Sequence, residues 1–227
     1  MAPRRKEKRT ERSKLDATPP WDTKRAHQVV STTGPFDIAD SPSDEVQRLD
    51  LGALRIPVET GLELRVDVDE QGEVAAVTLA NGTGQMQLGV FAAPRSEGIW
   101  QSVRAEIKAS ISSQGGTVTE TDGEFGPELS GKLPAPGGFT PVRFLGVDGP
   151  RWFLRAMLAG APAVEDGQAA VFLETFRKMI VVRGPEPLPV RDPVPLQLPR
   201  DAAEQLAAAA ADAEQLTAAS VDTEPDL

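Results

Sequence analysis

The chain has 227 residues, of which 40% are hydrophobic and 26% are charged, so it falls in the globular range and its length fits one domain. The absence of cysteine excludes disulfide bonds, thiolate nucleophiles and cysteine-ligated zinc. The basic N-terminus is followed by no apolar signal-like run, and no stretch approaches about 20 apolar residues, so we expect a cytoplasmic protein.

The net charge of −10 is spread unevenly along the chain. Residues 1–14 carry a charge of +5, and the tail from residue 201 onward carries seven acidic residues and no basic one. Residues 51–200 carry only −4, so the low isoelectric point favours no particular class of ligand.

These differences predict three regions. We expect a disordered basic arm and linker over residues 1–50, one folded domain over 51–199, and an acidic, alanine-rich tail over 200–227. The arm, residues 1–14, is interpreted either as a tether to nucleic acid or a membrane surface, or as a solubilising terminus. Trp21 and Phe36 are apolar enough to dock on the domain.

The first elements of the domain have strand periodicity. Apolar and charged residues alternate over 62–68, a period of two that puts one face on a core. Turn signals then separate this strand from two more, at 74–79 and 86–92. The three segments predict an antiparallel meander.

After Pro94 the apolar spacing becomes helical. Ser96 is a candidate N-cap for a helix that ends at 114–116. Further strands are predicted at 117–121, 127–133, 142–147 and 151–158, and a second helix is predicted from about Asp166. Residues 184–199 contain six prolines, which predict an extended strap around the domain.

Together these elements predict an α+β fold. We expect an antiparallel sheet of about seven strands, formed by meanders and hairpins, with two helices packed on one face and with disordered termini.

The sequence carries no recognisable catalytic residue, cofactor motif or metal site. The single histidine, His27, lies in the predicted linker, and no phosphate-binding or dinucleotide-binding loop is present. The densest acidic group in the domain is Glu120, Asp122, Glu124 and Glu128. It is interpreted as a solvated strand and loop, or as an acid–base group.

The most informative segment is the predicted hairpin over residues 142–155, because its register decides where three arginines lie. A three-residue loop at 148–150 would set Arg143 opposite Arg155, with Arg151 on the same face, which predicts a site for an anion or an acidic partner. A two- or four-residue loop would pair Arg143 with Leu154 and scatter the charges.

Four other side chains are open to two interpretations. Arg177 and Arg183 could join this arginine cluster or could stabilise the end of the second helix. Trp100 and Trp152 are interpreted as core anchors, with a ligand-stacking pair as the alternative.

Several motifs in the domain resemble a known family. They are LGALRIP at 51–57, QLGVFAAPRSEGIW at 87–100, QGG at 114–116, GVDGPRWFLR at 146–155 and RDP at 191–193. They are similar to the actinobacterial proteins grouped as domain of unknown function 3710, a resemblance that covers about 150 residues. The resemblance implies a cytoplasmic actinobacterial protein and no particular activity. The strand order also resembles PsbP-like α+β sandwiches, which implies nothing about function.

We therefore expect a non-enzymatic binding or scaffolding module for an acidic or phosphorylated partner, with Arg143, Arg151 and Arg155 as the candidate residues. Two alternatives remain. One is an enzyme acting on a small anionic substrate, with Glu120, Asp122 or Glu128 as acid or base. The other is a membrane-surface or nucleic-acid tether acting through residues 1–14.

Overall fold

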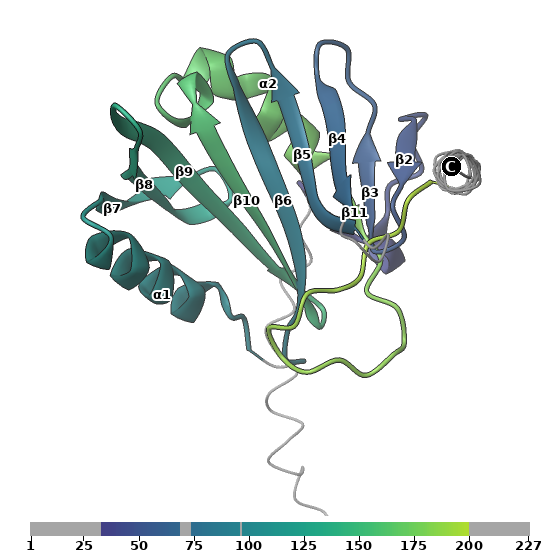
Figure 1. Cartoon of the computed structure of the whole chain (residues 1–227). Helices are drawn as coiled ribbons and strands as arrows, with labels where there is room; N and C mark the ends of the chain where they lie inside the picture. The colour runs from purple at the N-terminus through teal and green to yellow at the C-terminus, as the bar shows by residue number, and fades with distance from the viewer. Residues whose placement is uncertain (1–32, 69–73, 96, 200–227) are drawn as a thin grey trace, which may run out of the picture.

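The computed structural model describes residues 33–68, 74–95 and 97–199, which form two sheets and two helices (Figure 1). The larger sheet has seven strands, and every neighbouring pair is antiparallel. In spatial order they are β4 (Glu63–Val68), β5 (Val74–Asn81), β6 (Gly84–Ala92), β10 (Trp152–Gly160), β9 (Gly138–Gly149), β8 (Gly126–Ala135) and β7 (Thr117–Gly123). The predicted α+β class and seven-stranded antiparallel sheet are confirmed.

A smaller sheet lies against the larger one. Its order is β1 (Phe36–Asp37), β11 (Ile180–Val181), β3 (Leu54–Pro57) and β2 (Arg48–Asp50), and β1 pairs with β11 in parallel. Residues 36–50, predicted as part of a linker, therefore belong to the folded domain. Strands of two or three residues show no readable alternation, and they form here by pairing with distant segments. Trp21 and residues 1–14 lie outside the described residues.

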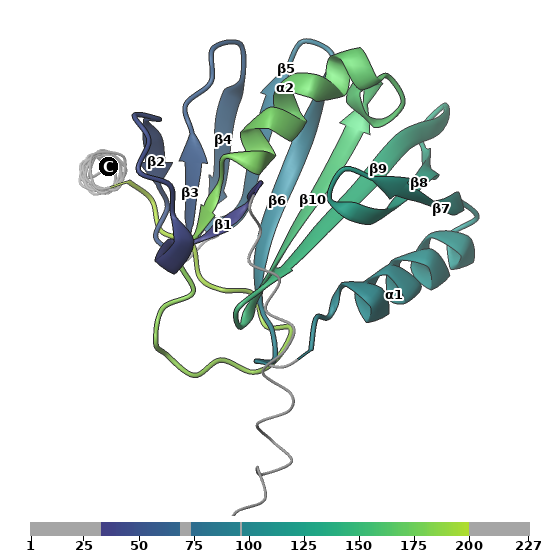
Figure 2. The ribbon, with the colours of Figure 1, turned by 180° about the vertical axis from the view of Figure 1, so that it is seen from behind.

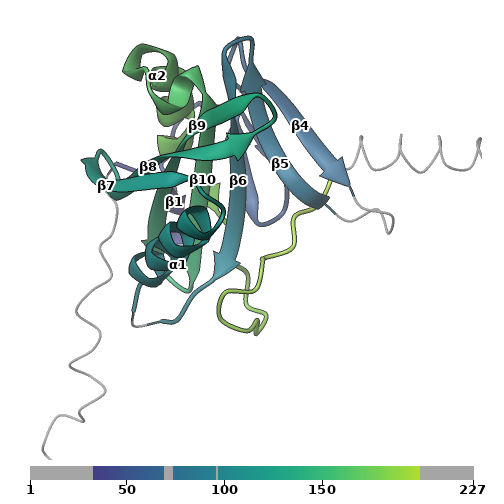
Figure 3. The same cartoon turned by 60° about the vertical axis from the view of Figure 1, so that its left-hand side comes forward.

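The helices α1 (Trp100–Ser113) and α2 (Asp166–Arg177) pack on opposite faces of the larger sheet. Two short 3₁₀ turns, η3 (Ile38–Asp40) and η4 (Ala161–Ala163), complete the secondary structure of the described residues. In Figure 1 α2 lies behind the sheet, and Figure 2 shows it in front from the opposite side. Figure 3 shows α1 beside the half of the sheet formed by β7 to β10.

The expectation that both helices share one face is corrected by the side chains of β10. Trp152, Phe153 and Leu154 are all buried, although successive residues of a strand point to opposite faces. Leu154 packs with the smaller sheet and α2, whereas Phe153 packs with α1. The start of this central strand is apolar on both faces, so a different helix packs on each face.

The proline-rich segment over residues 184–199 is an extended strap, the yellow-green loop at the bottom of Figure 1. Val194 N–H donates to the carbonyl of Val90 in the larger sheet, at 2.9 Å. Gln197 N–H donates to the carbonyl of Leu51 beside the smaller sheet, also at 2.9 Å. The strap therefore links the two sheets. Within the described residues, no helix is long and apolar enough to cross a membrane.

Candidate functional site

The three candidate arginines do not form the predicted cluster. The β9–β10 hairpin turns at Pro150 and Arg151, so Arg143 lies opposite Leu158 and Arg155 lies opposite Gly146. This register differs from both predicted alternatives. Because it places Arg143 and Arg155 on opposite faces of the sheet, the structure assigns each arginine a separate environment.

Arg143 is held in a largely buried ion pair. Its Nε donates to Glu128 Oε2 at 2.6 Å, and its Nη1 lies 3.6 Å from the exposed carboxylate of Asp166 at the start of α2. The Glu128 side chain is 1% exposed. The charge of Arg143 is therefore compensated within the fold.

Arg151 connects the hairpin turn to the strap. Its Nη2 donates to the carbonyl of Gly184, and its own carbonyl accepts from Ala93 N–H and from Arg183 Nε. Arg183 therefore lies beside Arg151, as one interpretation of the sequence allowed. Arg177 does not, because it pairs with Glu124 at the tip of the β7–β8 hairpin.

Arg155 is the candidate whose guanidinium has no partner in the part of the chain that the structure describes. Its Cζ lies 5.1 Å from the centre of the Phe91 ring, a cation–π contact. No hydrogen bond or ion pair joins its nitrogens to the described residues. These nitrogens are also not among the side-chain atoms that are fully buried without a hydrogen bond. Burial of the side chain lowers the pKa of Arg155. Its N–H groups therefore face solvent.

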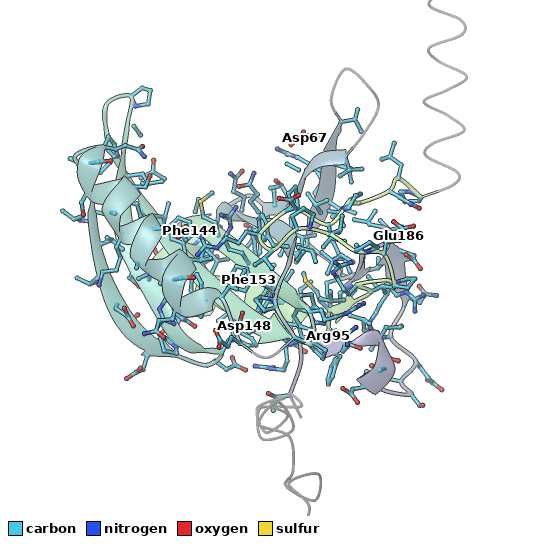
Figure 4. The ribbon with its side chains drawn as sticks, turned by 90° about the horizontal axis from the view of Figure 1, so that it is seen from below. Asp67, Arg95, Phe144, Asp148, Phe153 and Glu186 are labelled. Carbon is cyan, nitrogen blue, oxygen red and sulfur yellow. The ribbon has the colours of Figure 1, made fainter. Side chains whose placement is uncertain are left out.

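The Phe91 ring is one end of a row of three rings, Phe91, Phe153 and Trp100, that we call the aromatic row. The centres of Phe91 and Phe153 are 6.1 Å apart, and those of Phe153 and Trp100 are 5.5 Å apart. At the other end Arg104 lies over Trp100, at 5.3 Å. Figure 4 shows Phe153 near the middle of the sheet. An arginine thus lies at each end of the aromatic row.

The two end arginines differ in their counter-ions. Arg104 Nη2 lies 3.2 Å from Glu120 Oε1, whereas Arg155 has no corresponding carboxylate among the described residues. Lys108 lies 3.8 Å from the same Glu120 side chain. The positive charge of Arg104 at one end of the row is therefore compensated by Glu120, whereas that of Arg155 at the other end is not compensated by any of the described residues.

Glycines beside Arg155 allow this arrangement. Its cross-strand neighbours are Gly89 on β6 and Gly146 on β9. A Cβ at Gly146 would lie 2.4 Å from Trp100 Cδ2, and one at Gly89 would lie 2.9 Å from Phe91 Cε2. The rings therefore occupy the space that side chains at these two positions would need.

Next to Arg155, the sheet face on the α1 side carries exposed polar side chains on β4 and at the start of β6. Glu63, Arg65 and Gln85 on this face are exposed, and Gln87 is half-buried. The short side chain of Thr78 is buried between its cross-strand neighbours Arg65 and Gln87. We call this region, together with Arg155, the open face.

The acidic group predicted near the arginines is dispersed. Glu120 pairs with α1, Glu124 pairs with Arg177, and Glu128 pairs with Arg143. No group of three or more potential metal ligands occurs within residues 33–68, 74–95 and 97–199.

Both tryptophans are core residues, as the first interpretation expected. Trp100 Nε1 donates to the carbonyl of Pro127 at 2.7 Å, and Trp152 Nε1 donates to Asp37 Oδ2 at 2.7 Å. The sequence reasoning missed the role of Phe91. The available signal was the pair Gly89 and Phe91, two residues apart on one strand face, because a ring can lie over a glycine there.

A comparison with protein families identifies the group to which the sequence is related. The family model described as a protein of unknown function, DUF3710, matches residues 34–205. The chain belongs to the DUF3710 family. The match includes both sheets and the strap of this DUF3710 chain, and it confirms the resemblance seen in the motifs.

No curated protein matches the DUF3710 chain. Among solved structures, a crystal structure from Bacteroides thetaiotaomicron is similar at 12% identity and a TM-score of 0.39, with 64% of this chain and 52% of that chain covered. The match thus spans about half of the Bacteroides chain. The solution structure of cyanobacterial PsbP from Synechocystis is similar at 12% identity and a TM-score of 0.39, with 60% of this chain and 92% of that chain covered.

Proposed function

We propose that this DUF3710 protein is a non-enzymatic binding module for an acidic or phosphorylated partner, and that Arg155 on the open face receives the partner's anionic group. The observation that carries the proposal is the state of Arg155, which is partly buried, stacked on Phe91 and unpaired among the described residues. Partial burial of a cation without a counter-ion is unfavourable, and a carboxylate or phosphate would offset that cost.

The opposite end of the aromatic row supports this assignment. Arg104 has the same kind of ring contact and in addition has the carboxylate of Glu120 at 3.2 Å. A planar guanidinium has several N–H donors in a fork that matches a carboxylate or a phosphate. We therefore expect the partner to supply an anionic group that pairs with Arg155, as the carboxylate of Glu120 pairs with Arg104.

The surroundings of Arg155 suit a macromolecular partner better than catalysis. Gln85 and Gln87 place amide groups on the open face, where they can bond to a partner's backbone. The carboxylates considered as acid or base, Glu120 and Glu128, pair with arginines other than Arg155. No specific geometry therefore favours an enzyme.

The test compares the full-length wild type with Arg155→Gln, each carrying an affinity tag and purified from cells that make the protein. Co-purifying partners are quantified by mass spectrometry, and the strongest is purified for a Kd measurement. Loss of a bidentate charge-assisted contact costs about 1.5–3 kcal/mol, so we expect binding to weaken about 10- to 100-fold. Phosphatase treatment of the partner then distinguishes the two kinds of anionic group, because it abolishes binding through a phosphate and leaves binding through a carboxylate unchanged.

Arg65→Gln is the matched control, because Arg65 lies on the same face but is exposed and pairs with Glu63 at 3.0 Å. We expect this variant to keep nearly all of the wild-type affinity. Deletion of residues 1–14 should also leave this binding intact, whereas a tether acting through the arm would lose it. Equal affinity of the wild type and Arg155→Gln would exclude Arg155 as the binding residue.

A further inference from the structure

A second uncompensated positive charge lies at the end of the larger sheet, away from the open face. Arg183 follows β11 and is 8% exposed. Its Nε donates to the carbonyl of Arg151 at 3.1 Å, and its Nη1 donates to the carbonyl of Glu186 at 3.1 Å. Arg151 Nη2 in turn donates to the carbonyl of Gly184. Each arginine is thus held by the backbone of the other's segment.

These carbonyls satisfy N–H groups but do not neutralise charge. No carboxylate of the described residues lies within ion-pair distance of Arg151 or Arg183. Burial, and then the positive charge of Arg151, lower the pKa of Arg183, and the negative charge of Glu186 opposes this shift only in part. Two like charges are therefore held together in a partly desolvated position.

The backbone at Arg151 has a conformation that is uncommon for a residue with a side chain. Among the described residues, the non-glycine positions with positive φ are Arg151, at 64°, and Arg191, at 76°. Side chains with a Cβ are disfavoured there, and such residues cluster at functional sites. Arg191 forms an ion pair with Glu106 at 2.6 Å, whereas Arg151 forms none with the described residues.

We propose that Arg151 and Arg183 form a binding site for a phosphate-type dianion, either free phosphate or the phosphate of a monoester. Two guanidiniums with N–H groups left over can share the oxygens of one tetrahedral anion, and its two negative charges would offset their repulsion. The site is separate from the open face and does not include Arg155, so it goes beyond the proposed partner binding.

The test measures the thermal midpoint of the full chain in inorganic phosphate, in phenyl phosphate and in chloride, at equal ionic strength and pH. Binding to the folded state alone raises the midpoint as ligand concentration exceeds Kd. We expect either phosphate probe to raise the wild-type midpoint above its value in chloride. A larger shift with phenyl phosphate identifies a monoester as the ligand, and a larger shift with inorganic phosphate identifies the free ion.

Arg151→Gly is the decisive variant, because glycine adopts φ near 64° without strain while the guanidinium is lost. We expect a folded protein in chloride whose phosphate shift is lost. Arg191→Gly is its matched control, with the same substitution at a similar φ and outside the site, and it should keep the shift. The proposal is overturned if the wild-type shift is the same in phosphate and chloride, or if Arg151→Gly retains the wild-type shift.

Discussion

At the scale of single residues, charge pairing distinguishes the arginines of this protein. Arg143 has a buried partner in Glu128, Arg104 has Glu120, and Arg155 has none among the described residues. The remaining oxygen of Glu128, Oε1, is buried without a hydrogen bond. Because Glu128 depends on one arginine for its compensation, that pair should be sensitive to substitution.

We predict that Arg143→Leu destabilises the fold by about 3–5 kcal/mol, because it leaves the buried carboxylate of Glu128 uncompensated. The double substitution Arg143→Leu with Glu128→Leu should recover much of this loss, since no buried charge remains. Urea unfolding of Arg143→Leu, Glu128→Leu, the double variant and the wild type measures both effects. A double variant as unstable as the sum of the single ones would show that the two side chains act independently.

Residue identities predicted an arginine-bearing hairpin but not the arrangement of its arginines. Asp148-Gly149 is a strong local signal for a hairpin turn, yet the turn lies at Pro150 and Arg151. Asp148 instead accepts hydrogen bonds from Ile99 N–H at 2.8 Å and Trp100 N–H at 3.2 Å. That contact joins segments about 50 residues apart, so local sequence could not reveal it.

At the scale of elements, the contact of Asp148 with Ile99 and Trp100 lies at the start of α1. The sequence suggested Ser96 as the N-cap, a residue outside the described part, whereas the carboxylate of Asp148 bonds the first N–H groups of the helix. Figure 4 shows Asp148 near the edge of the molecule, below Phe153 in that view. A strand side chain thus performs the role usually taken by the residue before the helix.

We predict that Asp148→Ala costs about 1–2 kcal/mol, the usual range for loss of an N-cap. Hydrogen exchange should accelerate in α1 but not in α2. Glu165→Ala is the control, because Glu165 precedes α2 and makes no side-chain cap bond. Unchanged exchange in α1 after Asp148→Ala would contradict a capping role.

Most of the long elements could be predicted because alternation and helical spacing persist over enough residues. The strands at 63–68, 74–81 and 84–92 match the expected meander closely. The smaller sheet could not be predicted, since two of its strands have only two residues and exist through pairing across about 140 positions. Such pairs leave no periodic signal.

At the scale of the whole molecule, the strap holds the two sheets together. Val194 is 7% exposed and belongs to the core cluster shared by both sheets, whereas Val190 on the same strap is 50% exposed. The prolines around them predicted an extended segment, and they also reduce the entropy that the chain loses when it folds.

We predict that Val194→Asp destabilises the whole domain by about 3 kcal/mol or more, because it buries an unpaired charge between the sheets. Val190→Asp should change stability by about 0.5 kcal/mol or less, since that position is exposed. Thermal unfolding, monitored by tryptophan fluorescence, compares the stabilities of the two variants. Equal effects of the two substitutions would mean that the strap contributes no core contact at Val194.

The link between Gln197 and Leu51 also bears on the order in which the protein assembles. The two positions are 146 residues apart, so their contact cannot form until nearly the whole domain has been synthesised. Contacts of such long sequence separation slow folding. A nascent chain that ends before the strap would leave the edge of the core uncovered, and we expect it to depend on chaperones until residues 190–197 emerge.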